Sequence, residues 1–429
     1  MPMSQAFKDR LLPILPDIVA HFGTPFHIYD EAGIRVTGRE LLAAFAGVRG
    51  FREYFAVKAL PNPRVLAIMR EMGFGFDCSS IPELILGRGV GARGEEIMFT
   101  SNNTSAAEFE AALADGGCIL NLDDVSLVDK VPQMPALICF RYNPGMLRDG
   151  LQDAHGAIIG NPAESKFGVA HEQILEAYAR ARERGARRFG LHTMLVSNEL
   201  DIKVMVQTVD MLLDLATWIG ERLGIRFEFI NMGGGLGIPY RPEERAPDVA
   251  AMGAAISSLL DAFRSAQGYA PRLFMESGRF MTGPHGVLVT TAINRKEGAR
   301  RFVGVDAGMP ALMRPGMYGA YHHIDVVRPD GMEARGAPEV VDVVGSLCEN
   351  NDKFAVRRAL ARIAEGDWLL IQDTGAHGQA MGFNYNGRLR PQELLMRVNG
   401  SVERIRRAET VDDYLATLSF EPKVLRTDA

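Results

Sequence analysis

The sequence predicts an α/β fold in which a (β/α)8 barrel is followed by an antiparallel β-domain. About eight steps from a short apolar strand to a helix run through residues 36–285, and this pattern is typical of the barrel. Past Arg279 helices become few, and β-branched runs separated by turns predict antiparallel strands. A length of 429 residues agrees with a barrel plus one further domain.

The barrel strands are expected where short apolar runs stand between turns. We predict them at residues 54–57, 75–78, 97–100, 118–121, 136–142, 188–191, 227–232 and 272–276. Helices are predicted after all but the last of them, at residues 64–71, 81–87, 105–115, 124–130, 171–184, 204–220 and 249–267. The helix at 105–115 should begin with a capping box, because Ser105 opens it and Glu108 follows three residues later.

The β-domain is expected over residues 286–429. Its strands are predicted at residues 287–294, 301–305, 340–347 and 368–372, with a loop or short helix at 359–366 and a helix at 411–418. Residues 25–29 form a further strand ahead of the barrel, which can pair with this sheet. We therefore expect three parts: an N-terminal segment (1–35) that lends a strand to the β-domain, the barrel (36–285) and the β-domain (286–429).

Composition and charge exclude several classes of protein. With 47% hydrophobic and 23% charged residues the chain is globular, and its net charge of −6 argues against nucleic acid or an anionic membrane as partner. No apolar run reaches the roughly 18 residues of a membrane helix, and no secretory signal is visible. The four cysteines and nine histidines show no metal-binding spacing, so we expect a cytoplasmic protein without disulfides or metal. The GxSxG motif of serine hydrolases is absent.

Lys58 closes the apolar run that begins at Tyr54. Barrel enzymes place their active sites at the carboxyl ends of the strands, where this lysine is expected. In an apolar surround its pKa would fall, as a Schiff-base amine requires. The alternative is a lysine that simply reaches solvent.

Two further strand ends carry residues suited to chemistry. Met232-Gly-Gly-Gly-Leu-Gly237 exposes backbone N–H groups that can cradle a phosphate, although a plain tight turn would look the same. Glu276 and Arg279 share the next strand end, where a structural ion pair is the alternative to two separate roles. In those roles Glu276 binds a protonated ring nitrogen and Arg279 binds a substrate carboxylate.

Taken in order, these and other motifs resemble those of the fold-type III pyridoxal-phosphate decarboxylases, and most closely diaminopimelate decarboxylase. The resemblance covers nearly the whole chain. The matching strings are Phe22-Gly-Thr-Pro-Phe-His-Ile-Tyr29, Tyr54-Phe-Ala-Val-Lys58-Ala, Gly75-Phe-Asp77-Cys-Ser-Ser, Ser165-Lys-Phe-Gly168, Gly233-Gly-Gly-Leu-Gly237, Glu276-Ser-Gly-Arg279, Asp306-Ala-Gly-Met309, Arg314-Pro-Gly-Met-Tyr318, Cys348-Glu349 with Asp352, and Asn384-Tyr385-Asn386.

The resemblance implies an alanine-racemase-like barrel that binds pyridoxal 5'-phosphate. Lys58 matches the lysine that holds the cofactor covalently, Asp77 the acid near it, and Glu276 the acid on the pyridine nitrogen. The phosphate positions match Ser197, Gly234 and Gly235, with Tyr385 close by. His192 and Met194 lie on the matching strand, where Met194 replaces the ring-stacking histidine. A thioether can pack on the ring but is not expected to hydrogen-bond.

The resemblance also implies a small amino-acid substrate and a head-to-tail homodimer whose sites are shared across the interface. Arg279, Arg314 and Tyr318 match residues that hold the distal carboxylate of the substrate, and Tyr385 is expected close to it. Glu349 matches the acid that meets the distal amino group. Cys348 matches the cysteine that crosses the interface and acts in reprotonation.

The implied reaction is decarboxylation of meso-diaminopimelate to L-lysine and CO2. Two departures, Met194 and Ser277 in place of the motif proline, leave other substrates open. These are D-lysine, D-ornithine, or a larger amino-acid conjugate in a secondary-metabolite or siderophore pathway. An amino-acid racemase and a non-enzymatic, antizyme-like binding protein are the alternatives of other classes. Lys58, Glu276 and Cys348 together favour the decarboxylase.

Overall fold

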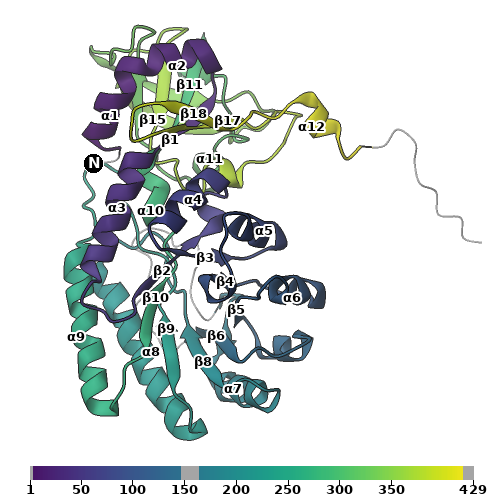
Figure 1. The fold of residues 1–429 in the computed structure, drawn as a ribbon. Helices are drawn as coiled ribbons and strands as arrows, with labels where there is room; N and C mark the ends of the chain where they lie inside the picture. The colour runs from purple at the N-terminus through teal and green to yellow at the C-terminus, as the bar shows by residue number, and fades with distance from the viewer. Residues whose placement is uncertain (1–2, 146–163, 419–429) are drawn as a thin grey trace, which may run out of the picture.

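The computed structural model describes residues 3–145 and 164–418, and its ribbon shows a barrel with a second sheet beside it (Figure 1). The barrel strands run parallel and follow the order β5-β4-β3-β2-β10-β9-β8-β6, and β5 pairs with β6 to close the ring. Short strand β7 (Val169–Ala170) extends β6. The barrel strands are β2 (Arg52–Ala56), β3 (Gly75–Cys78), β4 (Ile97–Phe99), β5 (Ile119–Leu122), β6 (Leu137–Asn143), β8 (Arg188–His192), β9 (Phe227–Asn231) and β10 (Arg272–Met275). The prediction of an alanine-racemase-like (β/α)8 barrel is confirmed.

Helices surround the barrel, as Figure 1 shows. They are α3 (Glu31–Ala44), α4 (Pro63–Glu71), α5 (Ile81–Gly89), α6 (Ala106–Leu113), α7 (Ile174–Glu183), α8 (Ile202–Leu223) and α9 (Val249–Gln267). The predicted capping box is present at α6, because the Ser105 hydroxyl accepts a bond from the Glu108 N–H and the Glu108 carboxylate accepts one from the Ser105 N–H. Where a helix was predicted at 124–130, the chain forms only a 3-10 helix over Val125–Lys130.

Large side chains on the strands fill the barrel below its carboxyl end. This apolar cluster consists of Tyr54, Met98, Ile119, Leu137, Cys139, Phe229 and Phe274. The rings of Phe229 and Phe274 stack with centroids 4.4 Å apart. A Cβ atom at Gly190 would lie 2.0 Å from the Phe229 ring, so glycine is required there. The filled interior leaves the carboxyl ends of the strands as the place for a site.

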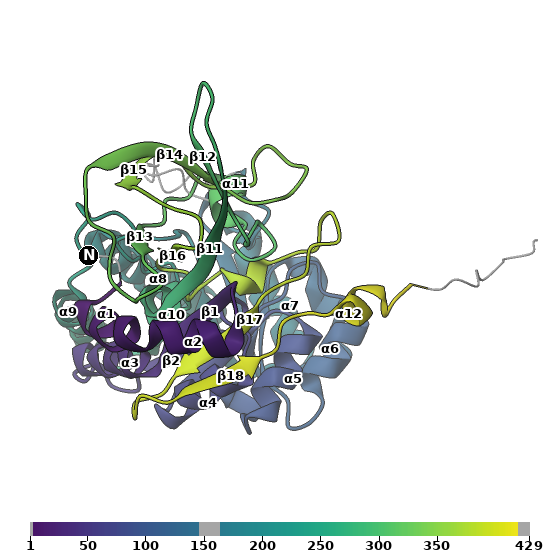
Figure 2. The ribbon, with the colours of Figure 1, turned by 90° about the horizontal axis from the view of Figure 1, so that it is seen from above.

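The second sheet follows the order β15-β14-β12-β11-β1-β17-β18, and β16 pairs with both β11 and β13. Seen from above, β1 lies between β11 and β17 (Figure 2). Its strands are β1 (Phe26–Asp30), β11 (Gly286–Lys296), β12 (Phe302–Val305), β13 (Ile324–Val327), β14 (Pro338–Val344), β15 (Lys353–Ala361), β16 (Trp368–Ile371), β17 (Gln392–Met396) and β18 (Val402–Arg406). The predicted N-terminal strand thus joins this sheet.

The sheet departs from the prediction in three respects. Strands β13, β15, β17 and β18 were not predicted. Most neighbours are antiparallel, but β1 pairs with β17 and β12 with β14 in parallel, which strand patterns alone do not reveal. The predicted loop or short helix at 359–366 is wrong at its start, because residues 359–361 complete β15. This edge strand exposes Arg357, whose φ of 48° interrupts the alternation that marks a strand. The limits 1–35, 36–285 and 286–429 remain a prediction.

The remaining helices are short. They are α1 (Gln5–Leu11), α2 (Leu15–Phe22), α10 (Arg279–Thr282), α11 (Arg314–Tyr318) and α12 (Val411–Leu415). Helices α1 and α2 bury Phe7 and Leu15 against β1 and β11. Among the described residues, no helix is both long and apolar enough to cross a membrane.

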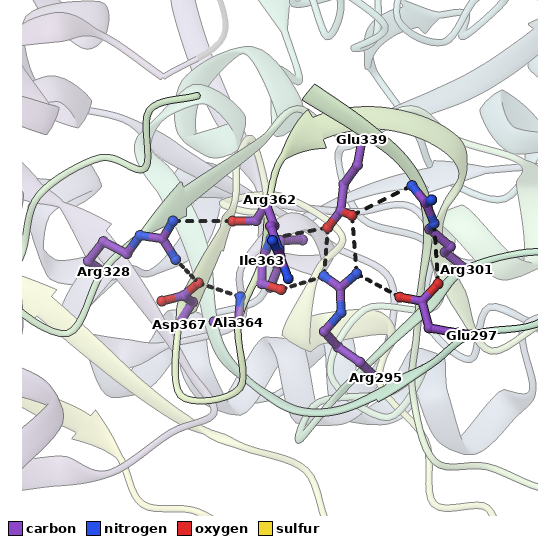
Figure 3. A network of polar contacts seen from close by, with 9 residues as sticks. All are labelled: Arg295, Glu297, Arg301, Arg328, Glu339, Arg362, Ile363, Ala364 and Asp367. Carbon is purple, nitrogen blue, oxygen red and sulfur yellow. Dashed lines mark hydrogen bonds and ion pairs between the residues drawn. The ribbon is translucent and has the colours of Figure 1, made fainter. Parts of the chain in front are cut away.

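Ion pairs brace the part of the β-domain drawn in Figure 3. Arg295 of β11 reaches Glu339 of β14 at 2.6 Å, and its hydrogen bonds lower the pKa of that carboxyl. Arg328 pairs with Asp367 in the turn before β16. The Glu339 side chain is only 13% exposed and Asp367 is buried, and both carboxylates already have partners, so we assign the network a structural role.

Candidate active site

A cavity of about 440 Å³ opens at the carboxyl ends of the barrel strands. All of the predicted site residues except three line this cavity. Those that line it are Lys58, Asp77, His192, Met194, Ser197, Gly234, Gly235, Glu276, Arg279, Arg314 and Tyr318. Barrel strands far apart in sequence, the segments that follow them, and α11 (Arg314–Tyr318) between β12 and β13 supply them, so the tertiary fold, rather than any local motif, brings them together.

Lys58 stands directly after β2, in a 3-10 turn over Val57–Ala59. Its side chain is exposed, and its charge acts on the carboxyl groups of Asp77 and Glu276. The expectation of an apolar surround is therefore wrong: the lysine faces two acids at the ends of β3 and β10. An amine in this position can form a covalent bond to a carbonyl group held in the cavity.

Glu276 is buried among donors. The Asn231 side-chain amide donates to its Oε1 at 2.7 Å, and His192 Nε2 lies 3.1 Å from its Oε2. Burial works to raise the pKa of Glu276, but His192, Lys58 and Asn231 outweigh it and hold the pKa below its usual value. Glu276 is thus a fixed carboxylate, suited to face a cationic group in the cavity.

Asp77 is the second buried acid of the site. Burial, followed by the negative charge of Glu276, raises its pKa well above the usual value, although Lys58 opposes this. Its Oδ1 has no hydrogen-bond partner among the described residues, and neither has Nδ1 of His192. Two buried polar atoms that lack partners beside a cavity indicate a ligand that supplies them.

The glycine loop after β9 forms one wall of the cavity. Gly233 and Gly235 have φ values of 71° and 93°, and a Cβ atom at Gly234 would lie 2.4 Å from the Glu276 carbonyl oxygen. Asn231 Oδ1 accepts from the Gly233 N–H at 2.9 Å, which fixes the start of the loop. The close packing leaves room only for backbone, as an anion cradle requires.

Met194 lies against this loop. Its Sδ accepts a hydrogen bond from the Gly234 N–H at 3.1 Å. The expectation that this thioether would not hydrogen-bond is therefore wrong, because sulfur is a weak acceptor and the N–H points at it.

Two arginines converge on one hydroxyl at the outer end of the cavity. The guanidinium groups of Arg279 and Arg314 donate to the Tyr240 hydroxyl at 2.6 and 2.9 Å. Neither side chain forms an ion pair within residues 3–145 and 164–418, although both are buried. Burial lowers the pKa of Arg314, and the charge of Arg279 acts in the same direction.

His322 supports this pair from behind. Burial, and then the charge of Arg314, lowers its pKa to about 3, so the ring is neutral. Its Nδ1 therefore donates to the Gln372 carbonyl at 2.7 Å, and its Nε2 accepts from Arg314 at 3.1 Å. The arginine pair thus donates to a hydroxyl and a neutral ring and forms no ion pair in the described part of the chain, although the buried Asp373 carboxyl also acts on Arg314.

Three predicted residues lie outside the cavity. Cys348 and Tyr385 are exposed and Glu349 is half-buried, all on loops of the β-domain. The Cys348 N–H donates to Asn386 Oδ1 at 2.7 Å, so the two loops are tied together. The structure does not bring Tyr385 to the phosphate cradle. That Cys348 and Glu349 reach a partner subunit stays a prediction.

The sequence analysis missed several residues of the site. Tyr240 has no motif around it that marks it, while Arg141 sits near the end of β6, a position that could have been noticed. His377 also lines the cavity, in a strained backbone conformation with φ of 56°. Burial and then the charges of Arg279, Lys58 and Arg314 lower its pKa well below the usual value.

Comparison with known proteins defines the class. Residues 38–283 match the family model of the pyridoxal binding domain of pyridoxal-dependent decarboxylases. The chain belongs to this family, and it is a pyridoxal-phosphate-dependent amino-acid decarboxylase of fold type III.

Individual relatives show which members of this family the chain is similar to. The chain is 46% identical to protein TabA of Pseudomonas amygdali pv. tabaci, over 98% of this chain and 97% of TabA. It is 36% identical to the diaminopimelate decarboxylase of Methanothermobacter thermautotrophicus, over 96% and 95% of the two chains. The structure of the M. jannaschii diaminopimelate decarboxylase in complex with L-lysine superposes with a TM-score of 0.83 at 28% identity, covering 95% of each chain.

The cavity fits pyridoxal phosphate. A lysine amine faces it, a carboxylate with a lowered pKa stands on one wall, and the glycine loop excludes side chains on another. The unpartnered Asp77 Oδ1 and His192 Nδ1 are the polar atoms that a bound ring with its substituents would meet.

Proposed function

We propose that this enzyme decarboxylates meso-diaminopimelate to L-lysine and CO2. The observation that supports this most is the arginine pair, Arg279 and Arg314, buried at the outer end of the cavity without a carboxylate partner among the described residues. A buried unpaired charge costs several kcal/mol, so the pair favours a substrate that brings its own distal carboxylate. The L-lysine complex of the similar M. jannaschii enzyme agrees with a product of this size.

The residues divide into those that hold the cofactor and those that hold the substrate. We assign Lys58 to the covalent link, Glu276 to the pyridine nitrogen, and Ser197, Gly234 and Gly235 to the phosphate, with Asp77, His192 and Met194 around the ring. When bound, the cofactor supplies an electron sink for the pair of electrons that departing CO2 leaves behind. Glu276 deepens this sink by keeping the ring nitrogen protonated.

The distal end of the substrate meets the arginine pair. Arg279 and Arg314 present planar guanidinium groups to a carboxylate, and Tyr318, half-exposed at the end of α11, adds a hydroxyl. D-lysine or D-ornithine would leave both charges without a partner. Position and charge together select for a carboxylate at the far end.

We further propose a cytoplasmic homodimer in which the partner subunit completes each site. Cys348 and Glu349 belong to a loop that lies outside the cavity of its own chain. Delivered by the partner, the Cys348 thiol would return a proton to the α carbon, and the Glu349 carboxylate would meet the distal amino group. The two loops that carry Cys348 and Tyr385 are already held together by the bond to Asn386.

The test is a comparison of substrates on two variants. Purified holoenzyme is offered meso-diaminopimelate, D-lysine, D-ornithine or L-lysine, and CO2 release is measured. We expect the highest kcat/KM with diaminopimelate. Arg279→Ala should raise KM for that substrate about 30-fold, from the loss of about 2 kcal/mol of charge pairing. Arg226→Ala, an exposed arginine ahead of β9, serves as the matched control.

The outcome also separates the alternatives. A higher kcat/KM for lysine or ornithine, with a preference that Arg279→Ala leaves unchanged, would refute the proposed substrate. Inversion of an amino acid without CO2 release would indicate a racemase instead. Binding without any turnover would indicate an antizyme-like protein.

A further inference from the structure

The cofactor cavity continues outward past the arginine pair. A second cavity of about 580 Å³ shares Ser197, Asn198, Arg279, Arg314 and Tyr318 with the first. Its far side adds Tyr240, Leu200, Arg241, Glu244 and Tyr321. The arginine pair therefore stands in the middle of a longer space and does not close it.

A third, outer cavity of about 310 Å³ adjoins the second. The two share Arg241, Gly319, Ala320 and Tyr321. The outer cavity also carries Arg358 and Lys353 of β15 on its wall. Three cationic side chains thus line a space that the proposed reaction does not use.

The two arginines of the outer cavity are held by an aromatic ring. The guanidinium carbons of Arg241 and Arg358 lie 4.6 and 4.0 Å from the centroid of the Tyr321 ring. Arg358 also donates to the His322 carbonyl at 3.0 Å, so the guanidinium is fixed in place. Cation–π contacts orient the charge of a guanidinium without neutralising it.

No acid neutralises these charges in the described part of the chain. Arg241, Lys353 and Arg358 form no ion pair there, and Lys353 reaches only the Asn350 side chain at 3.4 Å. The one carboxylate on the wall of the second cavity, Glu244, accepts from the backbone N–H groups of Tyr240 and Arg241. Burial lowers the pKa of Arg358, and the positive charge of Arg241 acts in the same direction, whereas Tyr321 opposes them. A lowered pKa is expected for a desolvated cation without a counter-ion.

We propose that Arg241, Arg358 and Lys353 form a second anion-binding subsite, which takes a carboxylate or phosphate group beyond the distal end of the substrate. The group is either an acidic extension of the substrate or a separate small anion. The subsite itself is independent of the proposed function, and only its assignment to the substrate rests on that function. Two guanidinium groups and one ammonium favour a dianion over a neutral ligand.

The first experiment measures anion binding to the holoenzyme by titration calorimetry, with succinate and inorganic phosphate as probes. We expect Arg241→Ala and Arg358→Ala each to weaken binding of at least one probe tenfold or more. Arg279→Ala should leave this binding event in place, because it affects the distal site alone. Arg245→Ala, an exposed arginine on the same loop as Arg241, is the matched control and should change affinity less than twofold.

Each outcome decides the proposal. It is overturned if the only binding event is the one that Arg279→Ala removes, or if Arg241→Ala and Arg358→Ala bind both probes like the wild type. It is also overturned if these variants dissociate the oligomer in sedimentation without changing anion affinity, since the cavity would then be a subunit contact. Should Arg358→Ala fail to fold, Arg241→Ala, at an exposed side chain, still gives the answer.

A second comparison identifies the source of the anion. Nα-succinyl-L-lysine and Nα-butanoyl-L-lysine carry acyl chains of the same length at the distal end of the proposed product, with and without a terminal carboxylate. Tenfold tighter binding of the succinyl compound, lost in Arg358→Ala, would place the anion on the substrate. Equal binding of the two, with succinate still bound on its own, would identify a separate small anion. Failure of the proposed function would show instead as an absence of CO2 release from diaminopimelate, with the anion titration unaffected.

Discussion

Ser277 and Glu53 form a pair whose replacement has a calculable cost. Glu53 is 1% exposed, and its Oε1 accepts from the Ser277 N–H at 2.5 Å. Its Oε2 has no partner among the described residues. The family motif that the chain resembles has proline at this position, and proline has no N–H to donate. Ser277→Pro therefore removes the one hydrogen bond that Glu53 accepts.

We expect Ser277→Pro to lower the free energy of unfolding by about 2 kcal/mol, since a buried polar group left unsatisfied costs about 1–3 kcal/mol. Glu53→Leu should cost a similar amount, because it leaves the Ser277 N–H unpaired. The double variant removes both partners and should lie within about 1 kcal/mol of the wild type. We therefore expect the change in unfolding free energy of the double variant to be far smaller than the sum of the two single changes.

The assay is urea unfolding of the holoenzyme at saturating cofactor, with wild type, both single variants and the double variant compared. The control is Ser265→Ala on the exposed face of α9. It should change the unfolding midpoint little. If the effects of the two single variants simply add in the double variant, Glu53 and Ser277 are not coupled and the reasoning is refuted.

Further predictions concern pH, the cofactor and the dimer. Burial and the negative charge of Glu276 raise the pKa of Glu53 well above its usual value, although the hydrogen bond from Ser277 opposes them. The folded protein therefore keeps a proton on Glu53 at pH values where the unfolded chain has released it. Stability should therefore fall as pH rises from the ordinary glutamate pKa toward the raised one, and Glu53→Gln should flatten this slope in urea unfolding at several pH values. Lys58→Ala should lose both CO2 release and the visible absorbance of covalently bound cofactor; a borohydride-reducible adduct in this variant would contradict its role. Glu276→Gln should keep cofactor but decarboxylate at least about 10²-fold more slowly, since a charge interaction of a few kcal/mol is lost, and wild-type turnover would assign the ring nitrogen to another group. When Lys58→Ala and Cys348→Ala chains are mixed in equal amounts, half of the dimers are hybrids with one intact site, so up to about a quarter of wild-type activity should return. If no activity returns although subunit exchange is demonstrated, one chain builds the whole site.

The sequence predicted best those site residues that end a barrel strand. Lys58 and Glu276 each follow an apolar run, and the closed barrel brings the ends of such runs to one mouth. Order along the chain was enough for these two residues, because the barrel leaves little choice about where a strand end lies, whereas Asp77, inside β3, was identified only through the resemblance to the family.

Residues on loops were predicted less well. Tyr240 joins the arginine pair only because its loop folds back over the barrel mouth, and nothing in the sequence near it indicates that path. Tyr385 was predicted near the phosphate but is exposed, whereas His377 of the same region lines the cavity. Motif spacing does not tell which side chain of a loop points inward. The parallel pairing of β1 with β17 depends likewise on contacts between segments remote in sequence.

The position of β1 determines when each of its two edges can be paired during synthesis. Its residues Phe26–Asp30 pair on one side with β11 and on the other with β17, whose register partners begin at Gln392. The barrel strands, by contrast, end at Met275. During synthesis all barrel strands are therefore made before either neighbour of β1, and the edge that pairs with β17 stays open until the final strands emerge. An unpaired β-edge is a template for association with other chains, so the long interval between barrel and sheet is the stage at which this protein is most exposed to aggregation.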